Sequence, residues 1–367
     1  MKKIVGILAA AAIATSVFAA DVSAATKIKG NLFSYTNEDK DDKGVVTPTT
    51  TALFSEGNDS HDYAQPNMTF SVSDDKAGAT VKLSTDGGDK AVKLTTQTIW
   101  FKPVDAFKVT VGNFDVALNK ETIKYTNSVT GLGGNGFLFT VDVSGFTLDL
   151  GLSAANEGFW FSKADGVDDP AIKSFFIKAG YAADFGTIGG YVEFNRSTRL
   201  PVYECHDAYF GLGTPKDGAI SDIHFGAGYA NNFDGINVFV NVAGFMADKF
   251  EWVRPEAFVS GNLDAFGFSA FVAPLIIVDS DTKIEGDKSI GCEVIAKVTY
   301  ALDGITPYAQ FLDHNVLAEK FTSTIEIGAS GSVGVMGWKA WAEIKTGCGT
   351  SKDKVNFAVP FELTLSF

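Results

Sequence analysis

Residues 357–367 of the chain read FAVPFELTLSF. Every second residue from Phe357 to Phe367 is large and apolar, and the residues between them are Ala, Pro, Glu, Thr and Ser. A period of two is typical of a β-strand that has one apolar and one polar face. Such a strand needs a second protein layer or another apolar medium to cover its apolar face. The rest of the sequence indicates which of the two is present.

The same alternation recurs along almost the whole chain. In residues 236–242, for example, Ile and Val occupy every second position and Asn237, Phe239 and Asn241 lie between them. After residue 20 there is no convincing helix pattern, and no apolar run there approaches the ~20 residues that a membrane-spanning helix needs. The expected strands, about 18 in number, span residues 26–35, 66–74, 78–85, 91–101, 106–118, 136–143, 146–152, 173–183, 186–195, 222–231, 235–245, 250–261, 266–277, 289–301, 304–312, 321–331, 335–345 and 354–367.

The connections between these strands alternate in length. Short ones, such as Ser144-Gly145 and Leu302-Asp303-Gly304, carry the Asp and Gly of tight hairpin turns. The longer ones are rich in Asp, Asn, Gly, Thr and Lys. Short turns on one side and long loops on the other are typical of a bacterial transmembrane barrel. We therefore predict a closed antiparallel transmembrane β-barrel of about 18 strands, with 16 as the next choice. The longer connections are residues 36–65, 119–135, 154–171, 196–221, 279–288 and 346–353, of which 36–65 and 196–221 are long enough to fold inward.

The N-terminus has the features of a secretory signal peptide. Two lysines at positions 2 and 3 precede an apolar, Ala-rich run from Ile4 to Ala20. We expect residues 1–20 to be the signal peptide and residues 21–367 to form the barrel. From residue 21 the chain has 28 basic and 44 acidic residues, a net charge of −16, which argues against a nucleic-acid partner. Cys205, Cys292 and Cys348 are too scattered for a zinc site, and we expect neither a metal nor a cofactor.

Aromatic residues recur where a strand meets a short turn. Trp100, Tyr181, Tyr229 and Tyr300 each end a strand on the side predicted to be apolar. Rings with a polar edge suit a membrane–water boundary, so we expect these four to form an interfacial girdle. In a bilayer the acyl chains cover the apolar face of 354–367, and pairing of this strand with 26–35 removes the unpaired edges.

A signal peptide, an even number of amphipathic strands and a terminal aromatic residue together resemble outer-membrane β-barrel proteins, the porins in particular. The resemblance covers the chain in pattern and not in residue identity. It implies the outer membrane of a diderm bacterium, a lipid bilayer as surroundings and a possible homotrimer. It also implies recognition by the barrel-assembly machinery, and the residues that match that signal are Phe361, Leu363, Leu365 and Phe367.

The polar face of the strands predicts the lining of a pore. Arg254 and Glu256 lie mid-strand and are our candidates for a constriction. The net charge of −16 favours cations by electrostatic steering. Inward aromatic residues, namely Phe176, Tyr191, Phe239, Phe271, Tyr308 and Trp341, suit either a sugar-stacking track or packing against a folded-in loop. The predicted pore-lining charges are Lys82, Lys93, Lys108, Asp149, Lys178, Glu193, Arg254, Glu256, Glu293, Lys297, Glu326, Lys339 and Glu343.

The function that this pattern favours is passive diffusion of small hydrophilic solutes or ions through a water-filled barrel. The alternative is a surface adhesion or interaction protein that uses the barrel as a scaffold for its loops. An enzyme is not expected, because no Ser, His and carboxylate spacing suggests a catalytic set. Residues 131–136 read GLGGNG and fit a phosphate-binding pattern, but a strand follows them and not a helix, so we interpret them as a flexible loop.

Overall fold

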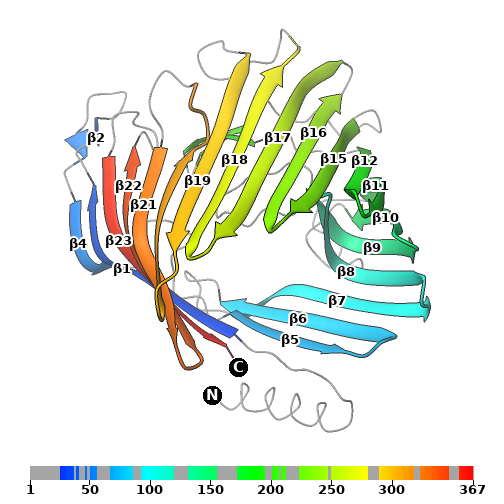
Figure 1. Cartoon of the computed structure of the whole chain (residues 1–367), viewed down its shortest axis with the longest axis horizontal. Coiled ribbons are helices and arrows are strands. Elements are labelled where there is room, and N and C mark those ends of the chain that lie inside the picture. Colours follow the sequence, from blue (N-terminus) through cyan, green and yellow to red (C-terminus); the bar gives the residue numbers. More distant parts are fainter. Residues whose placement is uncertain are drawn as a thin grey trace, which may run out of the picture.

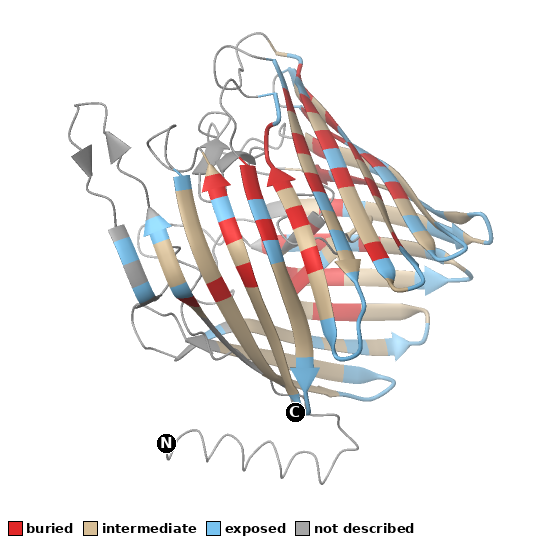
Figure 2. Ribbon diagram, turned by 60° about the vertical axis from the view of Figure 1, so that its left-hand side comes forward, coloured by how far each residue is buried: buried red, intermediate tan, exposed pale blue. Residues whose placement is uncertain are grey.

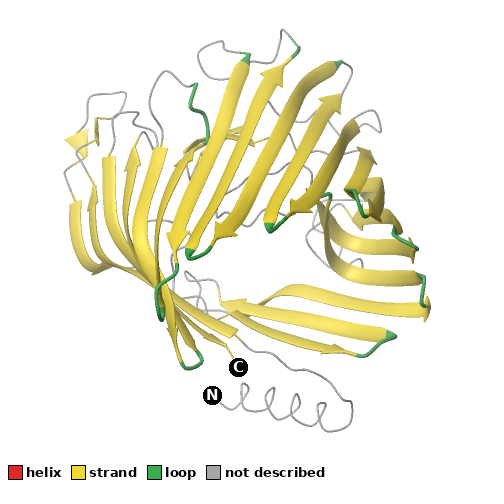
Figure 3. Ribbon diagram, in the orientation of Figure 1, coloured by secondary structure: helices red, strands yellow, loops and turns green. Residues whose placement is uncertain are grey.

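The structure is a computed structural model of the whole chain. It describes residues 25–36, 39–40, 46–47, 50–55, 67–85, 92–119, 131–154, 172–194, 201–205, 208–211, 223–246, 249–279, 289–317, 323–346 and 355–366. The predicted signal peptide and Phe367 lie outside these residues. The described residues form strands and turns (Figure 3). In this part of the chain no helix has the length and apolar character needed to cross a membrane.

Each predicted strand overlaps a strand of the structure. Additional short strands occur inside two of the predicted long loops: β2, β3 and β4 within 36–65, and the β13–β14 pair within 196–221. The bounds are β1 Ala25–Thr36, β2 Asp39–Lys40, β3 Val46–Thr47, β4 Thr50–Ser55, β5 Asn67–Ser73, β6 Ala77–Thr85, β7 Val92–Val104, β8 Phe107–Ala117, β9 Gly131–Val143, β10 Phe146–Ala154, β11 Ile172–Ala183, β12 Gly186–Phe194, β13 Pro201–Cys205, β14 Ala208–Gly211, β15 Ile223–Phe233, β16 Ile236–Met246, β17 Phe250–Leu263, β18 Phe266–Ile277, β19 Ile290–Tyr300, β20 Ile305–Asp313, β21 Ser323–Val333, β22 Met336–Thr346 and β23 Val355–Ser366.

The main sheet is an antiparallel meander that curls into a barrel (Figure 1). From β5 to β12 and from β15 to β23, each strand pairs with the next one along the sheet. The last strand then pairs with the first over almost its whole length, from Ala25–Ser366 to Thr36–Asn356, as predicted. The sheet contains 19 strands in 18 positions, because β4 and β5 share one position beside β1. β4 pairs with residues 31–36 of β1, and β5 also contacts β1. Among the described residues no backbone pairing joins β5 to β1 or β4, so the sheet is open along this single seam.

The outer face of the barrel is apolar and uncovered by protein. Along the strands, exposed apolar residues alternate with buried ones, which gives the banding of Figure 2. Ile177, Val240 and Val272 are all exposed, and Ile327 retains 63% of its accessible surface. In water such a belt would be an aggregation hazard, whereas acyl chains cover it in a bilayer. The two-faced strands therefore form one layer and not a sandwich.

Short turns join the strands at one end of the barrel. Ser144, Asp234 and Asp264 have positive φ, as the tight hairpin turns with the twist of the sheet require. The Asp74 carboxylate accepts hydrogen bonds from the backbone N–H groups of Lys76 and Ala77, and these lower its pKa. Lys76 also pairs with Asp105 in the next turn and lowers the pKa of that carboxyl group. The contact confirms that successive short turns lie at the same end.

One expectation about the loops is wrong. Residues 131–136 are not a flexible loop but the first part of β9, paired with β8 from Ala117–Gly131 to Gly112–Gly136. Their glycines allow close approach to neighbouring strands: a Cβ on Gly136 would lie 1.9 Å from the carbonyl oxygen of Leu152. A high glycine content is typical of a loop, but here the absence of side chains permits close pairing of strands.

Candidate functional site: the inner wall of the barrel

The predicted pore-lining residues lie on the inner face, opposite the exposed apolar belt. On β17, for example, Trp252, Arg254, Glu256 and Phe258 are buried, and Pro255 between them is exposed. With Glu256 included, the same alternation places eleven predicted charges besides Arg254 on the inner face, and the side chain of Lys93 lies outside the described residues. Those on the inner face are Lys82, Lys108, Asp149, Lys178, Glu193, Glu293, Lys297, Glu326, Lys339 and Glu343, together with Glu256 beside Arg254.

The candidates for a constriction, Arg254 and Glu256, belong to a buried polar chain across β16 to β20. The Arg254 guanidinium donates to Glu293 Oε2 at 2.5 Å, and its Nε lies 3.8 Å from Glu256 Oε1. His314 Nδ1 lies 2.8 Å from Glu293 Oε1. At the other end, Asn241 Nδ2 donates to Glu256 Oε2 at 3.4 Å. His314 and Asn241 were not predicted, because cross-strand register and not spacing along the chain brings them here.

Two smaller groups lie on the neighbouring strands β10 to β15. Lys178 donates to Asp149 at 3.1 Å, and the same carboxylate accepts a hydrogen bond from Thr140 at 2.7 Å. Nearby, His224 is buried between the Tyr191 hydroxyl, 2.9 Å from Nε2, and the Glu193 carboxylate, 3.4 Å from Nδ1. Each buried charge thus has an opposite charge or a hydrogen-bonding partner, as a folded wall requires.

A lysine-rich group covers the wall from β19 to β22. Lys339 Nζ lies 4.6 Å from the ring centroid of Tyr308 and 4.4 Å from that of Trp341, and 3.8 Å from Glu326 Oε2. Lys297 approaches the Tyr308 ring as well, at 5.2 Å. These cation–π contacts occupy the ring faces that a stacked sugar would need. The aromatic residues of this wall therefore position lysines and do not form a free stacking track.

Charges on the inner wall differ in how far they reach toward the lumen. In the ion pairs of Lys178 with Asp149 and of Lys339 with Glu326, the lysine side chains are 15% and 22% exposed and the carboxylates 6% and 1%. Lys82, Lys108 and Lys297 are also half-buried, whereas Glu193, Glu256 and Glu293 are buried. The exceptions are Glu362, half-buried in register with Lys339, Asp142, exposed beside a turn, and Asp115, exposed on the inserted hairpin. Among the described residues of the wall, the charge that faces the lumen is thus mainly positive.

Two apolar clusters also lie on the inner face. One joins β16 to β20 through Phe239, Phe258, Phe271, Ile295 and Leu312, with Phe239 and Phe258 stacked at 4.8 Å. The other joins Phe176 and Tyr191 to Phe114, Leu132 and Leu138 of β8 and β9. Four of the predicted inward aromatic residues are thus packed against other apolar side chains, which is the second of the two roles expected for them.

The second cluster exists because the distal part of the β8–β9 hairpin bends into the barrel. Within the described strands, residues 113–117 and 131–135 pair only with each other, since β7 pairs with β8 as far as Gly112 and β10 with β9 as far as Gly136. Gly112 has φ +106°, a conformation that side chains other than glycine rarely adopt. The hairpin leaves the wall at this point and buries Phe114 and Leu132 inside.

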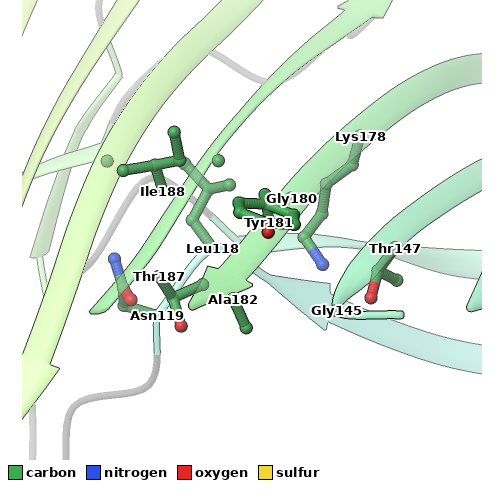
Figure 4. Close-up of a pocket in the computed structure, with 12 residues that line it drawn as sticks. Leu118, Asn119, Gly145, Thr147, Lys178, Gly180, Tyr181, Ala182, Thr187 and Ile188 are labelled. Carbon is green, nitrogen blue, oxygen red and sulfur yellow. The ribbon is translucent and has the colours of Figure 1, made fainter. Parts of the chain in front are cut away.

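Leu118 and Asn119, which follow β8, rest on a row of inner-face positions without side chains. Gly180, Gly189 and Gly228 are direct cross-strand neighbours on β11, β12 and β15. A cavity of about 110 Å³ remains here, lined also by Thr147 and Lys178 (Figure 4). Asn119 Nδ2 donates to Asn241 Oδ1 at 2.6 Å, immediately beside this row. The hairpin therefore reaches from β8 across the lumen side of the wall to β16.

The predicted interface aromatic residues divide into two groups. Tyr181 and Tyr300 are exposed on the outer face, and Tyr229 lies there too, in register with Ile188 and Val240. Trp100 differs from the expectation: it lies on the inner face, where it pairs with Gly78 and the buried Thr110. A bulge at Thr95 is the reason, because one extra residue in β7 exchanges the faces of all positions after it.

Three residues of the predicted assembly signal point outward from β23. Phe361, Leu363 and Leu365 lie on the face opposite Glu362, and Phe367 lies outside the described residues. Phe361 covers Gly30 of β1, where a Cβ would lie 3.0 Å from its ring. The outward orientation fits the alternation predicted from the sequence, whereas recognition of this strand by other proteins stays a prediction.

Other chemistry has little support in the described part of the chain. No group of three or more His, Cys, Asp or Glu side chains there is arranged to hold a metal ion. Cys292 forms no disulfide among the described residues, and the side chains of Cys205 and Cys348 lie outside them.

Comparison with known proteins gives a match at the level of fold. No family model matches the chain, and no curated protein matches it. Among solved structures it is similar to OpdL of Pseudomonas aeruginosa, with a TM-score of 0.53 and 12% identity over 94% of this chain and 98% of that one. It is also similar to the outer membrane protein OpdK of Pseudomonas aeruginosa, with a TM-score of 0.53 and 10% identity over 95% and 99%. OccK3 of Pseudomonas aeruginosa gives 0.52 and 13% over 94% and 95%. The chain therefore has the fold of an outer-membrane β-barrel along nearly its whole length.

Proposed function

We propose that this barrel is a porin of the outer membrane, through which small hydrophilic solutes diffuse passively. The observation that carries the proposal is the contrast between its two faces: an uncovered apolar exterior and an inner wall of paired charges narrowed by an inserted hairpin. An 18-strand barrel is wide enough for an aqueous channel. The similarity to the outer membrane protein OpdK supports the same location for this chain.

Within this function we propose a preference for anions. The negative net charge of the chain suggests a preference for cations. The electrostatic potential in the lumen, however, depends mainly on the charges near the path of the solute. Along the inner wall the lysines of β8, β11, β19 and β22 reach toward the lumen, and most carboxylates are buried beneath them. Because the more exposed ammonium groups lie nearer to the path of a solute than the carboxylates paired with them, their charge acts on the solute at shorter range.

The remaining expectations about surroundings are part of the same proposal. The exposed apolar belt fits a lipid bilayer, and residues 1–20 fit an export signal that precedes the barrel. Insertion by the barrel-assembly machinery and assembly into a homotrimer rest on the resemblance to porins. The adhesion alternative has less support, because a scaffold for loops does not need a charged and internally narrowed lumen.

Planar lipid bilayers test the proposal directly. The purified protein is first shown to be folded, because its gel migration becomes slower after boiling. The unboiled protein is then added to one chamber, and single-channel steps are recorded in KCl. We expect stepwise conductance and, under a KCl gradient, a reversal potential of the sign set by Cl⁻. A folded and inserted barrel without conductance steps overturns the porin proposal. Steps with a reversal potential set by K⁺ overturn only the anion preference.

A further inference from the structure

Resting on the proposed pore, we infer that Asn241 is the residue that positions the inserted hairpin and so determines the size of the opening. Its side-chain amide has two groups with different roles. The carbonyl oxygen accepts from Asn119 at the end of the hairpin, and the NH₂ group donates to Glu256 of the buried polar chain. Asn241 is 5% exposed, so its orientation is set by these two partners and not by water.

The wall beside Asn241 is shaped for this contact. Gly189, Gly228 and Asn241 are successive cross-strand neighbours on β12, β15 and β16. A Cβ on Gly189 would lie 3.1 Å from Leu118. A Cβ on Gly228 would lie 2.1 Å from Asn241 Oδ1 and 3.2 Å from Asn119 Nδ2. The absence of side chains at these two positions is what lets the end of the hairpin lie flat on the wall.

The other partner of Asn241 is itself held firmly. Glu256 is fully buried beside Arg254, and Arg254 is bound to Glu293, which contacts His314. This chain crosses four strands beyond β16 and keeps the Glu256 carboxylate in place. Asn241 therefore joins a fixed part of the wall to a hairpin whose distal half has no other strand partner among the described residues. Loss of this one amide frees the end of the hairpin at Asn119, whereas the packing of Phe114 and Leu132 and the pairing of the barrel strands remain.

A matched pair of glycine variants tests the inference. Gly228→Ala inserts a methyl group between Asn119 and Asn241 without removing either amide. Gly337→Ala, on the inner face of β22, places a Cβ no nearer than 3.8 Å to any other group. We expect Gly228→Ala to raise single-channel conductance about twofold and to make it fluctuate between levels, because the lumen of such a barrel is wide without its insert. Gly337→Ala should conduct like the wild type.

A second measurement does not depend on transport. In a background with all three cysteines replaced by serine, Leu118→Cys and Gly189→Cys are combined in the full-length protein, so that Asn119 and Asn241 keep their amides. We expect rapid disulfide formation under mild oxidation, and much slower formation when Gly228→Ala is added. An Asn237→Cys partner, on the inner face of β16 but near the turn, serves as the control and should not cross-link with position 118.

The outcomes separate the two proposals. A disulfide that forms in a barrel without conductance leaves the hairpin contact standing and removes the porin function. Wild-type conductance with no disulfide, and with Gly228→Ala indistinguishable from Gly337→Ala, overturns the role of Asn241 and leaves the porin function. If Gly228→Ala does not fold, as judged by heat-modifiable migration, Asn241→Leu replaces it and should give the same rise in conductance.

Discussion

The two sides of the lumen are built differently. From β11 to β15 the wall has a row of inner-face glycines, Gly180, Gly189 and Gly228, and a hairpin from another part of the chain lies across it. We call this the glycine wall. From β19 to β22 the wall carries Lys297 and Lys339, which lie over the buried rings of Tyr308 and Trp341. We call this the lysine wall. The glycine wall thus affects the width of the opening, because its bare backbone lets the hairpin lie against it. The lysine wall affects the charge that a passing solute meets, through its side chains.

This difference implies that the two walls respond differently to mutation. The polar groups of β17 and β19 beside the glycine wall are buried and paired with one another, so a change there acts on folding and on the hairpin. The lysines of the lysine wall are partly exposed to water, so a change of their charge acts mainly on the passage of the solute. Arg254 and Lys339 make the sharpest comparison, because both are cations paired with inner-face carboxylates but are 4% and 22% exposed.

The largest effect is expected for Arg254→Met. It leaves Glu256 and Glu293 buried without their cation, and breaking a buried pair in this way costs about 3 kcal/mol. Lys339→Met removes a cation that is 22% exposed and lies 3.8 Å from Glu326, and the Tyr308 hydroxyl still donates to that carboxylate, so this change should cost less, about 1 kcal/mol. Urea unfolding from lipid vesicles, followed by tryptophan fluorescence, measures both free energies.

Adding Glu293→Gln to Arg254→Met removes one of the two uncompensated charges and should recover part of the loss. Equal costs for the two single methionine variants would show that the walls do not differ in solvation, and the distinction between them would fail.

A smaller effect, on selectivity and not on folding, is expected for Lys339→Glu. It reverses a half-exposed charge on the lysine wall and should lower the Cl⁻/K⁺ permeability ratio several-fold, roughly 2 to 5, by changing the local potential. The reversal potential under a KCl gradient gives the ratio. Lys249→Glu, immediately before β17 and 62% exposed, is the control and should change the permeability ratio little. Because mobile ions screen such charges, the effect should shrink at 1 M salt.

The sequence predicted the strands well because alternation is a local property of each strand. Arg254 and Glu256 could be singled out in the same way, from their mid-strand positions on the polar face. Their partners could not, since His314 meets Glu293 only through the register of β19 with β20. Alternation along the sequence also assigns the wrong face after a bulge, because a bulge adds one residue that the sequence does not reveal. This is why the alternation predicts the outer face for Trp100, which lies on the inner face.

The inserted hairpin was the main omission. Length alone predicts that the loops 36–65 and 196–221 fold inward, and most of both loops lies outside the described residues. Residues 131–135 are a glycine-rich stretch that suits a flexible loop equally well, and residues 113–118 look like the end of an ordinary wall strand. A useful additional signal is the coincidence of that stretch with glycines in three later strands, Gly180, Gly189 and Gly228, which leave the wall bare. Only the fold brings these segments together.

The smallest effects should come from the turns, which belong to neither wall. Asp74 and Asp105 both have lowered pKa values, Asp74 through backbone N–H donors and Asp105 through Lys76. A depressed pKa in the folded state stabilises the barrel above the unfolded pKa of Asp, about 3.9, and the contribution is lost as pH falls through the folded value. Asp74→Asn and Asp105→Asn should therefore unfold more easily than the wild type at pH 7 and approach it below about pH 3. Salt distinguishes the two: 1 M KCl should abolish the difference for Asp105→Asn, an exposed ion pair, and leave most of it for Asp74→Asn, whose partners are backbone amides. A turn effect as large as that of Arg254→Met would mean that the stability of the barrel does not reside in its wall.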